Sequence, residues 1–174
     1  LSRSIPEIIN SNLFKFSPFK ALNTEQSISL SAVLERLLSD IGSDSQKQII
    51  IQGDPGTGKT VVAIYLIKML TDIARVPTEE LLDQDSIFSD FFTDEARELI
   101  KDFKIGLVVP QQSLRKTIQT VFAQTPGLSK DMVLTPFDVG ASNHHFDLLI
   151  VDEAHRLGQR ANQSSASQNV KFTE

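Results

Sequence analysis

The stretch IIIQGDPGTGKTVVAIYLI, residues 49–67, decides the fold. It consists of an apolar run, a turn that contains three glycines and ends in Lys-Thr, and a second apolar run. Gly53, Gly58, Lys59 and Thr60 satisfy the pattern G-x-x-x-x-G-K-[ST], and Gly56 adds a further flexible position. A loop of this spacing can wrap a di- or triphosphate with inward-pointing backbone N–H groups, which side chains would obstruct. The stretch therefore predicts a strand, a phosphate-binding loop and a helix in succession.

The residues at the end of this loop carry the expected phosphate chemistry. Lys59 is expected to reach the β and γ phosphates, and the Thr60 hydroxyl is expected to ligate Mg²⁺. A helix starting near Thr60 would add its unpaired N–H groups and positive dipole end. The alternative is a glycine-rich turn that only caps a strand. The predicted nucleotide-binding residues of the loop are Gly53, Asp54, Pro55, Gly56, Thr57, Gly58, Lys59, Thr60 and Val61.

Two acids end another apolar run, DLLIVDEA, residues 147–154. In open α/β folds ligands bind at the carboxyl ends of the parallel strands, so Asp152 and Glu153 are expected beside the phosphate loop. Neighbouring residues on a strand point to opposite sides, which allows the two acids different roles. Asp152 is expected to hold the Mg²⁺ shell, and Glu153 to orient or deprotonate the attacking water, with Lys59 as the second catalytic residue. The alternative is a strand that ends in surface acids.

Apolar periodicity places both motifs in an alternation of strands and helices, which predicts an α/β fold: a parallel sheet with helices on both faces. A helix is expected to begin with Thr24 as its N-cap and to stop at Gly42. Its expected apolar stripe is Ile28, Ser31, Ala32, Leu34, Leu38 and Ile41. The expected strands are residues 47–53, 105–110, 132–136 and 147–154, and the further helices are residues 60–74 and 111–124.

An acidic segment, residues 76–104, is expected to insert one or two amphipathic helices between strands. It holds nine acidic and three basic side chains, so it carries a charge of −6 in a chain of net charge −5. Its acids are expected to form a solvated face, with a partner-binding surface as the alternative. The apolar positions are Ile87, Phe88, Phe91, Phe92, Ala96, Leu99, Ile100 and Phe103.

Composition bounds the protein class. The chain has 174 residues, 40% of them hydrophobic and 22% charged, as in an ordinary globular domain. No apolar run is long enough to span a membrane, so no membrane partner is expected. The sequence contains no cysteine, which excludes disulfides and thiolate metal sites and agrees with a cytoplasmic location. Outside the acidic segment the charge is close to neutral, so any nucleic-acid surface would be local.

A glutamine upstream of the loop is a candidate for base recognition. Gln26 lies in LNTEQ, residues 22–26. A side-chain amide can donate to and accept from the edge of an adenine together, which gives a bidentate match. The alternative is a solvated polar group near the start of a helix.

LNTEQ, GDPGTGKT and DEAH, in this order, resemble the first motor domain of a DNA/RNA helicase-type ATPase. VVPQQSLRKTI and VDEAHRL are similar to segments of the Schlafen group-three-like DNA/RNA helicase domain family, and the resemblance covers residues 22–157. It implies a RecA-like P-loop fold, ATP and Mg²⁺ as cofactors, and DNA or RNA as a partner. It also implies that Gln26 reads adenine and that His155 links nucleotide state to later motifs. The positions that it places against a nucleic-acid backbone are Gln111, Gln112, Ser113 and Arg115.

The same family continues beyond DEAH with a coupling segment, a second RecA-like domain and an arginine that completes the site. A chain that begins at Leu1 and ends at Glu174 is therefore expected to be a fragment that binds nucleotide but hydrolyses it weakly. The expected organisation is a lead-in (1–23), an ATPase domain (24–157) and a polar tail (158–174). Two other functions remain open: an AAA-type ATPase that remodels proteins, and a nucleotide-sensing interaction module without turnover.

Overall fold

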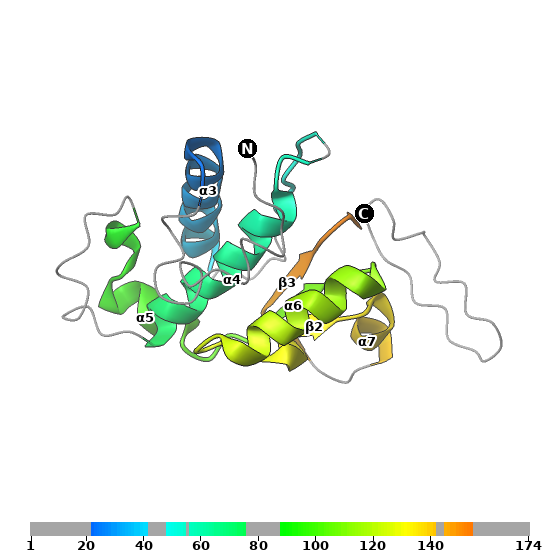
Figure 1. Cartoon of the computed structure of the whole chain (residues 1–174). Coiled ribbons are helices and arrows are strands. Elements are labelled where there is room, and N and C mark those ends of the chain that lie inside the picture. Colours follow the sequence, from blue (N-terminus) through cyan, green and yellow to red (C-terminus); the bar gives the residue numbers. More distant parts are fainter. Residues whose placement is uncertain (1–21, 42–47, 55, 76–87, 142–144, 155–174) are drawn as a thin grey trace. The chain divides into compact units, whose positions relative to one another are not determined.

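The computed structural model describes residues 22–41, 48–54, 56–75, 88–141 and 145–154 (Figure 1). It divides into two compact units. The first consists of Leu1–Asp102 with Thr125–Leu128, and the second of Phe103–Gln124 with Ser129–Glu174. Most of the expected lead-in and the whole expected tail lie outside the described residues.

Helix α3, Thr24–Asp40, belongs to the first unit. Asn23 is its N-cap, so the expectation that Thr24 would cap the helix was wrong. The buried residues are Leu30, Val33, Leu34 and Leu37, whereas Ile28 is 62% exposed. Only Leu34 was in the expected stripe. The buried residues follow the i, i+3, i+4, i+7 spacing of one helical face with large side chains, whereas the expected stripe relied on Ser31 and Ala32, which bury little apolar area.

Helix α4, Lys59–Arg75, confirms the helix expected over residues 60–74. Every residue from Thr60 to Leu70 is buried, so the helix has no solvent-facing side over this length. It contacts α3 and α5 within the first unit. An almost uniformly apolar helix is stable in water only when neighbouring elements cover it, and α3 and α5 supply part of that cover.

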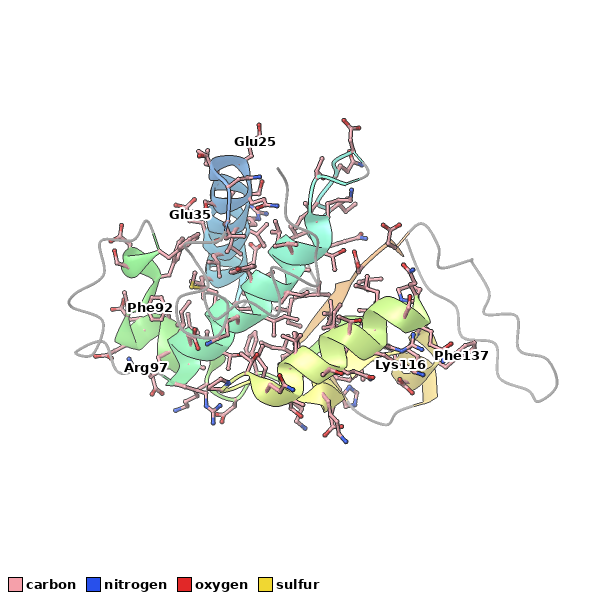
Figure 2. The ribbon with its side chains drawn as sticks, viewed as in Figure 1. Glu25, Glu35, Phe92, Arg97, Lys116 and Phe137 are labelled. Carbon is pink, nitrogen blue, oxygen red and sulfur yellow. The ribbon has the colours of Figure 1, made fainter. Side chains whose placement is uncertain are left out.

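The described part of the acidic segment forms η3, Ser89–Phe91, and α5, Asp94–Ile100. The Thr93 side chain caps α5 by accepting a hydrogen bond from the Ala96 backbone N–H. Phe92 is buried and Arg97 is partly exposed; both are labelled in Figure 2. Of the expected apolar positions, Phe88, Phe92, Ala96 and Ile100 are buried, Phe91 and Phe103 are partly exposed, Leu99 is 42% exposed, and Ile87 lies outside the described residues. The amphipathic character of the segment is therefore confirmed for α5 in all but one position.

The second unit contains a parallel sheet of order β2-β1-β3. Its strands are β1, Ile105–Val108, β2, Val133–Leu134, and β3, Leu148–Val151. The central strand β1 is fully buried, which fits the uninterrupted apolar run of a parallel strand. A Cβ on Gly106, in the middle of β1, would lie 2.9 Å from the Leu134 side chain and 3.0 Å from that of Leu149. The neighbouring strands thus pack their side chains over a position that only glycine leaves open.

Helix α6, Gln112–Gln124, connects β1 to β2 and confirms the expected helix. Two short elements were not expected: η4, Lys130–Met132, and α7, Pro136–Ala141. The signal for α7 was present in the sequence. The Asp138 N–H donates to the Thr135 hydroxyl, and the Thr135 N–H donates to the Asp138 carboxylate, so the two residues form a reciprocal cap with proline at the first helical position.

The strand expected over residues 47–53 is absent from the part of that segment that the structure describes. Residues 48–54 form no strand, and Ile49, Ile50 and Ile51 are 40%, 68% and 40% exposed. An apolar sequence becomes a strand only when its backbone N–H and C=O groups pair with a neighbour, and no such pairing is made by these residues. The expectation was wrong because β-branched composition reports suitability for a buried strand, not the presence of a partner.

Candidate nucleotide-binding site

The phosphate loop lies directly before α4 in the first unit, at the end of the helix nearest to the start of α3 (Figure 1). Gly56 and Gly58 have φ angles of +83° and +87°, in the left-handed region that glycine adopts without steric cost. The Thr57 backbone N–H and hydroxyl both donate to the Asp54 carbonyl, at 3.3 and 2.9 Å. These bonds fold the loop back on itself, whereas Pro55 lies outside the described residues.

The Lys59 ammonium points into this loop. Its Nζ donates to the carbonyl oxygens of Gly53, at 2.7 Å, and Asp54, at 2.9 Å. Two neutral carbonyls are weaker partners for an ammonium than a phosphate, because the phosphate adds the attraction between opposite full charges. The observed position therefore places the Lys59 charge where an anion held by the loop would meet it.

Gln26 reaches the same loop from α3. Its side-chain Nε2 donates to the Thr57 carbonyl at 3.2 Å, across 31 positions of sequence. Its Oε1 accepts from the Asn23 backbone N–H at 3.1 Å, while the Asn23 side chain accepts from the Gln26 N–H at 2.8 Å. This reciprocal pair is a capping box, and it fixes the start of α3. Asn23 was missed as a site residue, although its spacing to Gln26 in NTEQ is the signature of such a box.

Thr60 and Val61 begin the buried length of α4. Thr60 is 8% exposed and Val61 is 2% exposed. The first hydrogen bond across the junction runs from the Val62 N–H to the Gly58 carbonyl, at 3.1 Å. Backbone N–H groups at a helix start lack intrahelical acceptors and carry the positive dipole end, so the residues after Gly58 suit an anion. The loop, its lysine and this helix start fit a nucleotide phosphate.

The two expected acids lie at the end of β3 in the second unit. Asp152 is 7% exposed, and its backbone N–H donates to the Val108 carbonyl at 3.0 Å. β3 itself ends at Val151, so the acids lie in a turn and not on the strand, which corrects the expectation of alternating strand positions. The physical reason is local: Glu153 has a φ of +54°, which an extended strand cannot accommodate. Their approach to Lys59 stays a prediction.

A non-glycine residue in the left-handed region is uncommon and is held there by its surroundings. Glu153 is the only described non-glycine residue with a positive φ angle. Such backbone strain gathers at functional sites, which agrees with the role expected of Glu153.

The positions expected against nucleic acid lie at the start of α6, directly after β1. Gln111, Gln112 and Ser113 are exposed. The Arg115 guanidinium instead donates to the carbonyls of Val109, at 2.7 Å, and Pro110, at 3.2 Å, so it stabilises the turn that leaves β1. The nucleic-acid role of all four residues stays a prediction, and His155 lies outside the described residues.

Metal-binding clusters and membrane-spanning helices are both absent from the described residues. No group of three or more His, Asp or Glu side chains there is arranged to hold a metal ion. Among the same residues, no helix has the length and apolar character needed to cross a membrane.

The parallel sheet, the glycine-rich loop before a buried helix and the inward-pointing lysine agree with a RecA-like P-loop domain, the fold of helicase-like ATPases. The chain belongs to the family described as type III restriction enzyme, res subunit, whose sequence profile matches residues 19–173. No curated protein and no solved structure shows significant similarity to the chain. The family match supports a helicase-like ATPase motor domain, and it does not assign the Schlafen group-three-like family.

Proposed function

We propose that this chain is the ATP-binding first motor domain of a nucleic-acid-dependent ATPase, which hydrolyses ATP with Mg²⁺ in the intact protein. The observation that carries the proposal is the convergence of two side chains on one loop. The Lys59 ammonium occupies the interior of the loop, and the Gln26 amide contacts it from α3. Membership of a helicase-like family agrees with this arrangement.

The chain's own residues then divide the chemistry. The backbone N–H groups of residues 56–61 and the Lys59 ammonium bind the phosphates, and Gln26 recognises the adenine edge. Thr60 and Asp152 would hold Mg²⁺, which neutralises charge on the β and γ phosphates when bound. Glu153 orients the attacking water and accepts its proton. His155 couples nucleotide state to nucleic-acid binding.

The nucleic-acid part of the proposal rests on the family and on the exposed polar start of α6. Gln111, Gln112 and Ser113 are available there to phosphate oxygens, and Arg115 orients the turn beneath them. Stimulated hydrolysis further requires the second RecA-like domain and the completing arginine that the Schlafen-type resemblance implies. The domain limits of 24–157 with an insert at 76–104, and the cytoplasmic location, stay predictions.

Calorimetry with Mg·ATP and Mg·ADP tests the nucleotide site. We expect the wild-type chain to bind both, and Lys59→Ala to lose most of the binding because the only lysine inside the described loop is removed. Lys130→Ala, which removes an exposed lysine of the second unit, is the matched control and should bind like the wild type. Equal affinity in wild type and Lys59→Ala would refute the proposal.

The dependence of ATP hydrolysis on nucleic acid has to be tested with the intact protein. Single-stranded DNA or RNA should accelerate its ATP hydrolysis, because coupling of this kind separates nucleic-acid motors from AAA-type protein remodellers. If neither nucleic acid changes the rate, the AAA-type alternative is preferred. If the intact protein binds Mg·ATP but does not hydrolyse it, with or without nucleic acid, the nucleotide-sensing module is preferred.

A further inference from the structure

We propose that Gln26 is a positioning residue for the phosphate loop, in addition to any contact with the base. Its hydrogen bond to the Thr57 carbonyl fixes the Thr57–Gly58 peptide group and thereby directs the Gly58 N–H toward bound phosphate. The inference rests on the proposed function, because it assumes that the loop binds phosphate. It assigns Gln26 an effect on the phosphates that adenine recognition alone does not predict.

The first step is the geometry of the contact. Gln26 Nε2 lies 3.2 Å from the Thr57 carbonyl oxygen, and a Cβ built on Gly58 would lie 2.3 Å from the same Nε2. The amide is therefore pressed against the peptide group that joins Thr57 to Gly58. Any side chain at Gly58 would displace it.

The second step concerns the direction of the Gly58 N–H. In a planar trans peptide the C=O and the following N–H point in opposite directions. Because Gln26 holds the Thr57 oxygen on the side of α3, the Gly58 N–H points in the opposite direction, away from α3. A phosphate-binding loop depends on this orientation. If its N–H groups already face the anion, no affinity is lost in rearranging the loop on binding.

The third step is that Gln26 is itself held rigidly. Its Oε1 accepts from the Asn23 N–H at 3.1 Å, and the Asn23 side chain accepts from the Gln26 N–H, so both the backbone and the side chain of Gln26 are anchored at the start of α3. A side-chain amide offers two donor hydrogens and two acceptor lone pairs, and these contacts use one of each. One donor and one acceptor remain for a base, so positioning the loop and reading adenine are compatible.

The experiment compares ligands with and without a base. Mg-tripolyphosphate carries the phosphates of ATP and no base, so a residue that only reads adenine cannot affect its binding. We expect Gln26→Ala to weaken tripolyphosphate binding about fivefold, the typical effect of one hydrogen bond, and to weaken GTP binding by the same factor. Gln26→Glu keeps the acceptor for the Asn23 N–H but cannot donate to Thr57, so it should weaken binding as well. Gln124→Ala, an exposed glutamine of α6, is the matched control.

A spectroscopic readout in the ligand-free protein separates positioning from a general loss of structure. With ¹⁵N-glycine labelling, the Gly58 amide resonance should shift in both Gln26 variants and remain unchanged in Gln124→Ala. The resonances of Gly106 and Gly127 should stay in place in all of them, because neither glycine is in contact with Gln26.

The outcomes are distinguishable. Unchanged tripolyphosphate affinity with weaker ATP binding in Gln26→Ala overturns the inference and leaves Gln26 as a base reader. A loss in Gln26→Glu alone assigns the effect to its negative charge and also overturns it. If the wild type binds neither ATP nor tripolyphosphate, the proposed function fails, and the Gly58 resonance still decides whether Gln26 positions the loop.

Discussion

At the scale of single residues, the two left-handed glycines of the phosphate loop differ only in their surroundings. Gly56 has a φ of +83° and no heavy atom within 4 Å of an added Cβ. Gly58 has a φ of +87°, and an added Cβ would lie 2.3 Å from Gln26 Nε2. Replacement by alanine therefore introduces the same backbone strain at both positions. Only the alanine at position 58 also collides with a neighbour, the Gln26 amide.

We expect Gly56→Ala to lower the free energy of unfolding by about 1–2 kcal/mol, the cost of a left-handed non-glycine residue. Gly58→Ala should cost about 1–2 kcal/mol more, because the new methyl group must displace the Gln26 amide. Urea denaturation of both variants measures the difference. In the Gln26→Ala background the excess cost at Gly58 should disappear; an unchanged excess would show that Gln26 is not its source.

Glu153 is a residue at which strain and chemistry can be separated. Its φ of +54° is retained by Glu153→Gln and relieved by Glu153→Gly. We expect Glu153→Gln to keep the stability of the wild type and Glu153→Gly to match or exceed it by up to about 1 kcal/mol, while both abolish hydrolysis in the intact protein. Thermal denaturation and a phosphate-release assay measure the two effects. Hydrolysis at the wild-type rate in Glu153→Gln would remove Glu153 from the catalytic residues.

At the scale of elements, α4 contains a charged pair at the end of its buried length. Lys68 and Asp72 form an ion pair one helical turn apart, with side chains 7% and 19% exposed. Burial raises the pKa of the Asp72 carboxyl above its ordinary value of 3.8, although the hydrogen bond and charge of Lys68 act in the opposite direction. Folding therefore takes up a proton in the window above pH 3.8, and the contribution of Asp72 to stability falls as the pH rises through that window.

Lys68→Met should lower the free energy of unfolding at pH 7 by about 3 kcal/mol, because it leaves a largely buried carboxylate without its partner. The double variant Lys68→Met/Asp72→Leu should return to within about 1 kcal/mol of the wild type, since apolar residues replace the pair. The loss in Lys68→Met should shrink toward pH 4 as Asp72 becomes protonated. Denaturation curves at pH 4 and pH 7 decide it: a loss independent of pH would mean that packing, and not charge, is responsible.

Elements were predictable from the sequence where one periodic signal also determined the packing. Helix α4 is apolar on every face, β1 is an uninterrupted apolar run and α6 has a helical period, so each was found close to its observed limits. Helix α3 was found but its buried face was not, because its large apolar residues lie on more than one face, and only the packing decides that Leu30 is buried and Ile28 is exposed. Residues 49–51 were expected in a strand. A strand forms only beside a pairing partner elsewhere in the chain, and the local sequence does not show whether that partner is present.

At the scale of the whole molecule, the proposed Mg²⁺ site draws its ligands from residues far apart in sequence. Thr60 belongs to the first unit and Asp152 to the second. The loop half of the site could be predicted because its spacing is local, and the structure adds the contacts of Lys59 and Gln26. Whether Asp152 binds the same metal ion as Thr60 depends on contacts between distant parts of the sequence. It is tested by measuring a distance between the two units.

Fluorescence energy transfer between the units provides that measurement. The sequence has no cysteine, so Glu35→Cys on α3 and Ala123→Cys on α6, both exposed, give unique dye positions. We expect saturating Mg·ATP to narrow the distribution of distances between the two dyes, because the proposed Mg²⁺ ligands Thr60 and Asp152 belong to different units. In Lys59→Ala, Mg·ATP should leave the distance distribution unchanged, because this variant loses most of its nucleotide binding. Asp152→Asn should bind ATP, but the distribution should narrow less, because the metal ion loses its ligand from the second unit. A distribution that Mg·ATP leaves unaltered in the wild type would count against Asp152 as a ligand of the metal ion.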